Sequence, residues 1–182
     1  MPRGHPPYPP AQENVENTYM DQQYLPQGDY LVSQITQSPL EVDVREAWSI
    51  IFGEIFCSYE GFSIRHEANL QGGRSDMEVS RIINRHRLNF LVLELKRSSY
   101  LNSTRALRDA ETQLKGYLDS LGNTQDDKVW GALCIGKNVQ FYQFSNGNGA
   151  PELFALHEGM LRVDRQPQTV TQWLQYIRSN IM

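Results

Sequence analysis

The chain has 182 residues, of which 40% are hydrophobic, and a formal net charge of −4. This length and composition suit one domain with its own core, and the mild acidity argues against a protein that coats nucleic acid non-specifically. No run approaches eighteen apolar residues, and the first residues lack an apolar segment, so we expect neither a membrane span nor a secretory signal peptide. Two cysteines, Cys57 and Cys134, lie in apolar segments and predict free thiols in an intracellular protein, nuclear or cytoplasmic.

Residues 1–27 differ from the rest in composition, being rich in Pro, Gln and Asn and poor in aliphatic residues. Such a segment cannot bury enough apolar surface to offset its ordering entropy, so we predict a flexible arm, followed by one domain over residues 28–182. The tyrosines Tyr8, Tyr19, Tyr24 and Tyr30 leave an alternative open, in which the arm docks on the domain, on a partner or in a homodimer.

The first half of the domain predicts one helix and three strands. Apolar residues recur at three- and four-residue steps over 41–59, which indicates a helix with one buried face. Alternating patterns with intervening turn residues predict strands over 61–70, 76–83 and 88–96. The last of these is apolar enough for the centre of a sheet.

The second half predicts a helix between two parallel strands. Asn102-Ser103-Thr104 supply capping side chains for a helix that Gly122-Asn123 would end. Strands are expected over 129–136 and 138–144, an edge strand over 151–156, and a final helix capped by Thr169. The expected fold is therefore α/β: a single domain with an αβββαβ core and a central mixed sheet flanked by helices.

Asp76 and the tripeptide Glu94-Leu95-Lys96 carry the chemistry that the sequence suggests. Side chains alternate along a strand, so Glu94 and Lys96 point to the same face while Leu95 points to the other. Two acids beside a lysine can bind a hard divalent cation and hold a water molecule against it. Solvated charges at a strand end are the simpler interpretation of the same residues.

This pattern resembles the PD-(D/E)XK, or restriction-endonuclease-like, nuclease superfamily, in which an Asp precedes an Asp/Glu-x-Lys on the next strand. Ser75 replaces the proline that often precedes the Asp. The resemblance implies a nuclease that hydrolyses DNA or RNA with Mg²⁺ or Mn²⁺, with Asp76 and Glu94 as metal ligands and Lys96 acting on the attacking water and the phosphate. Domains of this appearance are frequent in fungal genomes. The alternative is a catalytically silent nuclease-like fold that binds nucleic acid or protein.

Two further positions follow from this resemblance. The family draws a third acid from the first helix, and Glu54 borders the apolar face there while Glu46 lies opposite it, so Glu54 is the better candidate. Gln113 and Tyr117 share a helix face and resemble the motif of the RecB-like branch, in which the glutamine orients water or the scissile phosphate. Packing of Tyr117 beside a solvated Gln113 is an equally good interpretation.

Basic residues gather around the predicted site. Residues 74–108 carry eight lysines and arginines against three acids, although the whole chain is acidic. Arginines are suited to contacting backbone phosphates, so we expect part of this segment to bind nucleic acid. The candidates are Arg74, Arg81, Arg85, Arg97, Arg105 and Arg108.

Overall fold

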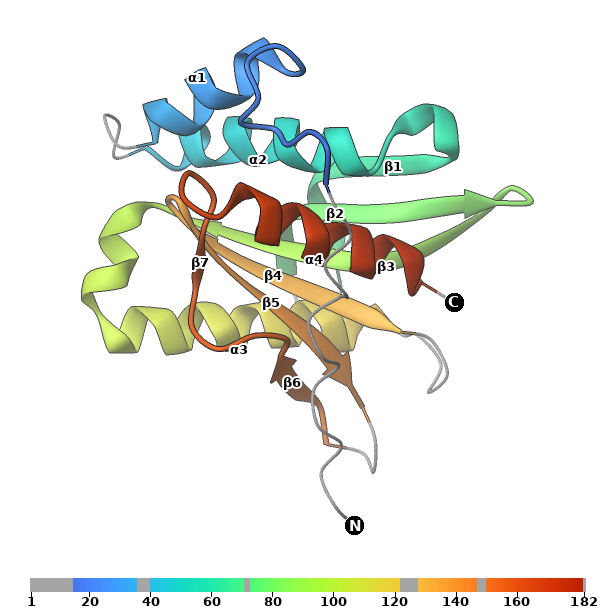
Figure 1. The fold of residues 1–182 in the computed structure, drawn as a ribbon. Helices are drawn as coiled ribbons and strands as arrows, with labels where there is room; N and C mark the ends of the chain where they lie inside the picture. The colour runs from blue at the N-terminus through green and yellow to red at the C-terminus, as the bar shows by residue number, and fades with distance from the viewer. Residues whose placement is uncertain (1–14, 36–39, 71–72, 122–127, 147–149, 182) are drawn as a thin grey trace.

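The computed structural model describes residues 15–35, 40–70, 73–121, 128–146 and 150–181 (Figure 1). Its helices are α1 (Pro26–Gln34), α2 (Glu41–Ile55), α3 (Thr104–Ser120) and α4 (Pro167–Ser179), with short 3-10 helices η1 (Ser58–Glu60) and η2 (Ser98–Asn102). Its strands are β1 (Phe62–Leu70), β2 (Gly73–Ile83), β3 (His86–Lys96), β4 (Val129–Ile135), β5 (Asn138–Ser145), β6 (Glu152–Ala155) and β7 (Leu161–Arg162).

Within the described residues the strands form one seven-stranded mixed sheet. Its order is β1-β2-β3-β4-β5-β6, and β7 pairs with β5 beside this path. The β3–β4 pair is parallel and every other pair is antiparallel. Parallel neighbours need a crossover connection, and α3 supplies it. The predicted α/β class, with its strand–helix–strand crossover and central mixed sheet, is confirmed.

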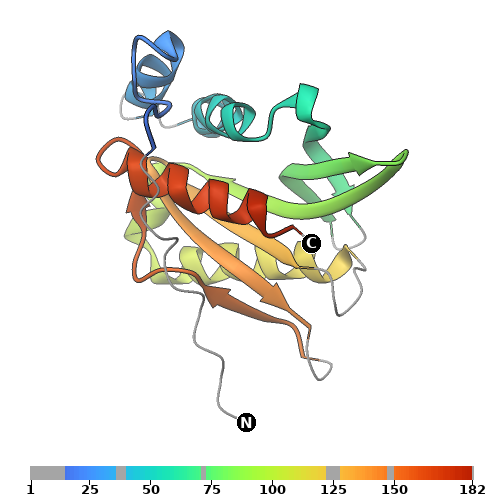
Figure 2. The same ribbon diagram turned by 45° about the vertical axis from the view of Figure 1, so that its right-hand side comes forward.

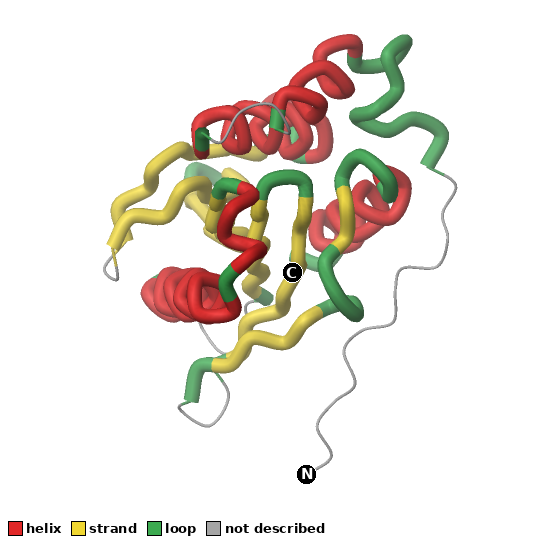
Figure 3. The backbone as a smooth tube through the Cα atoms, turned by 90° about the vertical axis from the view of Figure 1, so that its left-hand side faces the viewer, coloured by secondary structure: helices red, strands yellow, loops and turns green. Residues whose placement is uncertain are grey.

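Helices cover both faces of the sheet, and each face has its own apolar cluster (Figures 1 and 2). On one side α2 and α4 pack against β3 and β4, where Trp48, Trp173 and Leu93 are buried. On the other side α3 packs on the same strands through Leu114 and Leu118. The sheet is thus the middle layer between α3 and the remaining helices (Figure 3). Such burial of large apolar side chains stabilises the fold by about 1.5–3 kcal/mol each.

A glycine fixes how closely α3 approaches the sheet. A Cβ atom at Gly131 on β4 would lie 2.9 Å from Leu118 Cδ1 and 3.1 Å from Leu114 Cδ2. The first distance is shorter than real Cβ contacts and the second is tighter than nearly all of them, so the absence of a side chain at Gly131 lets α3 lie close to β4. The close packing holds the polar residues of α3 against the end of β3.

Two helix boundaries differ from the sequence prediction. The helix α2 ends at Ile55, and a separate 3-10 turn follows at η1, so the predicted helix over 41–59 is too long. The last helix begins at Pro167, two residues before Thr169, which is therefore not its cap. Proline suits the first turn of a helix because its φ is already helical and no backbone N–H is lost. Gly122-Asn123 lies outside the described residues.

The part of the N-terminal segment that the structure describes packs on the domain and is not the flexible arm that we predicted. Residues 1–14, with Tyr8, lie outside that part. Tyr19 is only 2% exposed, and its hydroxyl donates a hydrogen bond of 2.9 Å to the carbonyl of Val163. Gly28 on α1 lies so close to the backbone of Tyr19 that a Cβ there would lie 1.9 Å from the carbonyl oxygen. Residues 15–27 therefore pack on the domain, which is the docking alternative; the composition of the segment could not reveal one deeply buried tyrosine.

None of the helices in the described part of the chain is both long and apolar enough to cross a bilayer.

Candidate active site

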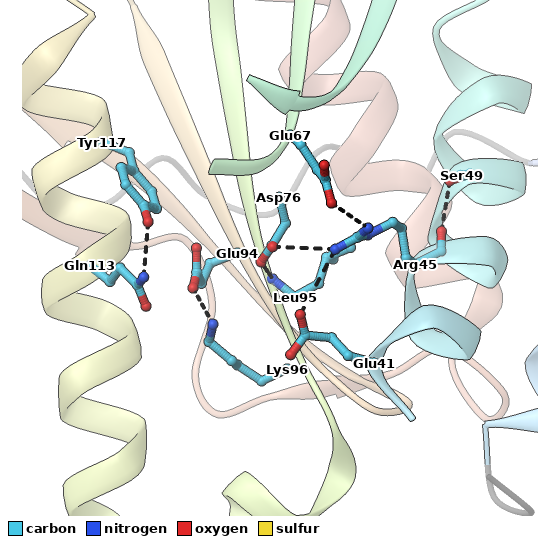
Figure 4. Close-up of polar contacts among 10 residues, drawn as sticks. All are labelled: Glu41, Arg45, Ser49, Glu67, Asp76, Glu94, Leu95, Lys96, Gln113 and Tyr117. Atoms are coloured by element: carbon cyan, nitrogen blue, oxygen red, sulfur yellow. Dashed lines mark hydrogen bonds and ion pairs between the residues drawn. The ribbon is translucent and has the colours of Figure 1, made fainter. Parts of the chain in front are cut away.

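Asp76, Glu94 and Lys96 lie together where β2 begins and β3 ends (Figure 4). The antiparallel register pairs Met77 with Leu93, so the next position brings Asp76 beside Glu94 on the neighbouring strand. The sequence prediction that these three residues meet agrees with this geometry. Adjacent strands lie about 4.8 Å apart, which is close enough for two carboxylates to act on one cation.

Glu94 and Lys96 form a buried ion pair. The side chain of Glu94 is 1% exposed and that of Lys96 is 13% exposed, and the ammonium donates to Glu94 Oε1. Burial raises the pKa of Glu94 to about 7; the hydrogen bond from Lys96 opposes this rise and the charge of Asp76 adds to it. Burial opposes the charge on Lys96, yet the hydrogen bond and charge of Glu94 raise its pKa overall. Lys96 thus stays charged while Glu94 titrates close to neutral pH.

Asp76 is held by a backbone donor and faces an arginine. Its Oδ2 accepts a hydrogen bond of 2.7 Å from the backbone N–H of Leu95, which also fixes the side chain against β3. Its Oδ1 lies 3.7 Å from a guanidinium nitrogen of Arg45 on α2. Leu95 therefore contributes its backbone N–H to the site, while its side chain packs in the apolar cluster on the other face of the sheet, under α2.

Arg45, Glu41 and Glu67 were not predicted to lie at the site. Besides Asp76, Arg45 contacts Glu67 on β1 at 3.0 Å and Glu41, one helical turn earlier, at 3.9 Å. Figure 4 shows these acids converging on the guanidinium from α2, β1 and β2. The i, i+4 spacing of Glu41 and Arg45 could have suggested their pairing, but no sequence signal links either to Glu67. Arg45 partly neutralises this acidic edge and orients Asp76.

The expected third acid, Glu54, does not lie at the site. Glu54 accepts a hydrogen bond of 2.6 Å from the hydroxyl of Tyr24 in the N-terminal segment. The helix α2 instead brings Glu41 towards the site, and the charge of Glu41 acts on both Glu94 and Lys96. Glu54 is thirteen residues further along the helix, about 20 Å along its axis. The prediction was wrong because angular position on a helix does not say which end faces the sheet edge. The other candidate, Glu46, is exposed.

Gln113 and Tyr117 face the site from α3. The amide nitrogen of Gln113 donates a hydrogen bond of 2.9 Å to the hydroxyl of Tyr117. Figure 4 shows the pair on the side of Glu94 and Lys96 that is opposite α2. The charges of Glu94, Asp76 and Lys96 all act on the phenol of Tyr117, whose pKa is raised mainly by burial. The exposed Gln113 therefore borders the site, and Tyr117 holds it in place.

The donor atoms fit a divalent cation that keeps part of its water. Among the described residues, no group of three or more His, Cys, Asp or Glu side chains is arranged to hold a metal ion. Mg²⁺ commonly uses one or two carboxylates, with water and substrate phosphate completing its shell. Asp76 and Glu94 supply two carboxylates, and Glu94 Oε2 is buried without a hydrogen-bond partner among the described atoms. An unpartnered buried carboxylate oxygen is costly to keep, and a cation would satisfy it.

The six predicted arginines are dispersed. Arg81 stacks over the Phe62 ring at 5.5 Å on the side of α2, away from Lys96. Arg85 lies exposed in the turn after β2, and Arg97 is exposed directly after Lys96. On α3, Arg105 is 93% exposed beside Asp109, and Arg108 is exposed. Arg74 belongs to β2, and its side chain lies outside the described part.

Comparisons of the chain with protein-family models, curated proteins and solved structures find no match.

Proposed function

We propose that this protein is a metal-dependent hydrolase of nucleic-acid phosphodiester bonds, the activity that the resemblance to PD-(D/E)XK nucleases implies. One observation carries the proposal: the buried Glu94, with Oε2 unpartnered among the described atoms, lies between Asp76 and the ion-paired Lys96. A structural ion pair needs no second acid beside it. A cation and a phosphate would satisfy all three side chains at once.

The protein's own residues would take distinct roles. Asp76 and Glu94 would hold Mg²⁺ or Mn²⁺, which supplies Lewis-acid stabilisation of phosphate charge and acidifies water when bound. The backbone N–H of Leu95 keeps Asp76 oriented. Lys96 places a fixed positive charge where negative charge accumulates as the attacking water loses its proton. Gln113, held by Tyr117, would orient the water or the phosphate from α3.

A second candidate is a silent nuclease-like fold that binds nucleic acid or protein. The arginine Arg45 favours it, because its guanidinium gives the acids at the mouth of the site a cationic partner without any metal. The two candidates differ in whether a divalent ion binds between Asp76 and Glu94, and in whether a phosphodiester is then cleaved.

Calorimetric titration with Mn²⁺ tests the metal site. Asp76→Asn keeps an oxygen that can accept from Leu95 N–H but removes a charge, so it should weaken Mn²⁺ binding by at least about tenfold. Asp109→Asn is the matched control, because Asp109 is 73% exposed on α3 and should leave binding unchanged. Equal affinities in the wild type and Asp76→Asn would exclude this metal site.

Cleavage assays then separate the two candidates. Fluorescent DNA and RNA, single-stranded and nicked, are incubated with either metal. An enzyme should lose about a hundredfold or more in rate on Lys96→Met, because the lost charge acts on the transition state. Circular dichroism checks that the variant is folded at the assay temperature. If the wild type binds Mn²⁺ but cleaves none of the substrates, the catalytically silent fold is the better description. Equal cleavage by the wild type and Lys96→Met would indicate a contaminating nuclease.

A further inference from the structure

A polar strip lies beside the site on the face of the sheet that bears Glu94 and Lys96. Strand pairing places Arg65 of β1 opposite Glu78 of β2, and Glu78 opposite Val92 of β3. Val92 packs in the cluster under α3, so all of these positions share the face of Glu94. The side chain of Arg65 remains 48% exposed there. In Figure 1 the tip of the β2–β3 hairpin projects beyond the end of α3.

An irregularity in β3 adds a second arginine to this strip. The β2–β3 register shifts by one between Val79 and Ser80, and the neighbours Phe90 and Leu91 both enter the core under α2. Residues before the shift therefore exchange faces. Simple alternation from Glu94 would place Arg87 on the opposite face. Instead Arg87 donates hydrogen bonds to the hydroxyls of Ser80 at 2.5 Å and Ser63 at 3.5 Å, both in the strip.

A buried carboxylate, Glu78, lies beside Arg65 and within the electrostatic reach of Arg87. Glu78 is 1% exposed, and both of its carboxylate oxygens lack a hydrogen-bond partner among the described atoms. Arg65 Nη1 lies 3.9 Å from Glu78 Oε1, and the charges of Arg65 and Arg87 both act on Glu78. Burial raises the pKa of Glu78, and the two arginines oppose that rise. One buried negative charge between two guanidinium groups leaves a net positive charge facing solvent.

The strip is close enough to the acids to contact the same ligand. Arg65 lies two strands from Glu94 and two residues along the sheet, which strand spacing converts to about 12 Å between backbone positions. Each guanidinium has five donors in a planar fork that matches phosphate oxygens. Arg87 is exposed, and only one of its terminal nitrogens is used in the contacts with Ser63 and Ser80. Donors of both arginines therefore remain for an anion.

We propose that Arg65, paired with Glu78, and Arg87, held by the hydroxyls of Ser63 and Ser80, bind a backbone phosphate of a nucleic-acid strand, a few nucleotides from the bond at Asp76 and Glu94. The proposal rests on the proposed function for its choice of polyanion. The nucleic acid would then run across the sheet from the active site, over β2, towards β1. Phosphate contacts at a distance from the scissile bond fix register and orientation rather than sequence.

Fluorescence anisotropy with labelled twenty-nucleotide DNA and RNA strands in EDTA tests this site without metal or cleavage. Each salt-dependent phosphate contact on a single strand contributes about 0.7 to the slope of log affinity against log salt. Arg65→Gln and Arg87→Gln should each weaken binding, and the double variant, which removes this one phosphate contact, should flatten the slope by about 0.7. Arg81→Gln is the matched control, since Arg81 lies on β2 but stacks on the opposite face, and should match the wild type.

The outcomes separate this site from the proposed activity. An unchanged slope in the double variant, equal losses in Arg81→Gln, or a wild type that binds neither strand would overturn the phosphate site, even if cleavage is observed. A flattened slope in the double variant, together with a wild type that cleaves none of the substrates, would keep the phosphate site and refute the nuclease. If the double variant fails to fold, Arg65→Lys and Arg87→Lys carry the test: both should keep the slope and lose affinity, because the charge remains and the fork is lost. Unchanged affinity in both would overturn the proposal.

Discussion

Replacing Lys96 by methionine should produce a stability loss that depends on pH. Methionine keeps much of the apolar length of the side chain and removes the ammonium that Glu94 Oε1 accepts from. In metal-free protein at pH 8, Glu94 is ionised in the wild type, because its pKa is about 7. The variant would then bury that carboxylate without its lysine. At pH 5 Glu94 is protonated in both proteins, so the lost ammonium matters little.

The expected size follows from proton linkage. Above pH 7 the wild type releases the Glu94 proton while the variant, whose Glu94 has lost its lysine, still holds it. The extra loss therefore grows by about 1.4 kcal/mol over the unit from pH 7 to pH 8, which for a chain of this size lowers the melting temperature by roughly 3–6 °C. The folded pKa of Glu94 lies above its ordinary value of 4.5, so folded protein holds this proton more tightly than unfolded protein between those values. The contribution of Glu94 to stability therefore falls as pH rises through this window, and in the variant the fall extends to higher pH.

Urea unfolding in EDTA at pH 5 and pH 8 measures the difference, with Lys137→Met as a matched control. Lys137 is 12% exposed and lies 3.6 Å from Asp164. The pKa of Asp164 is lowered, chiefly by its hydrogen bond from Arg162, so this partner is ionised at both pH values. The control should lose the same stability at pH 5 and pH 8. If Lys96→Met also loses equally at both, the buried-carboxylate description of Glu94 is wrong.

Two further substitutions test the corrections that the structure makes. Tyr19→Phe should lower the unfolding free energy by about 1–3 kcal/mol in thermal or urea unfolding, because the carbonyl of Val163 loses its buried donor. Tyr30→Phe is the control and should change the unfolding free energy little, since that side chain is 61% exposed. Equally small effects of both substitutions would contradict the packing of the N-terminal segment. Glu41→Gln should weaken Mn²⁺ binding several-fold in calorimetry, the order expected for one charge acting on a divalent ion across solvent, whereas Glu54→Gln should not; the reverse result would restore Glu54 to the site.

The succession of helices and strands along the chain and the pairing of the two acids could be predicted because the information for them is local. Asp76 and Glu94 lie on consecutive strands joined by a short turn, so their pairing follows once the two strands are placed. The apolar run before Glu94 marked β3 as central, and all of its residues from Phe90 to Leu95 are buried. Lys96 then follows by alternation.

The missed parts of the site depend on information that periodicity lacks. Glu54 has a suitable angle on its helix but lies at the wrong end of it, which only the packing of α2 on the sheet decides. Arg87 lies on the face of Glu94 because of a one-residue shift in pairing, and counting alternate positions cannot foresee such a shift. Tyr19 lies in a segment of polar composition, and the residue that accepts its hydrogen bond is 144 positions away.

The hydrogen bond between Tyr19 and Val163 also bears on the order in which the chain can fold. Val163 lies 144 residues after Tyr19 and just before α4, so the acceptor for Tyr19 and the helix beside it leave the ribosome long after Tyr19 does. Contacts so distant in sequence form late, because the chain between them must be ordered first. The N-terminal segment should therefore wait, exposed to proteases and chaperones, until synthesis of α4 is complete. A chain that stops before Val163 would never bury Tyr19. Its N-terminal segment would stay exposed to proteases and chaperones.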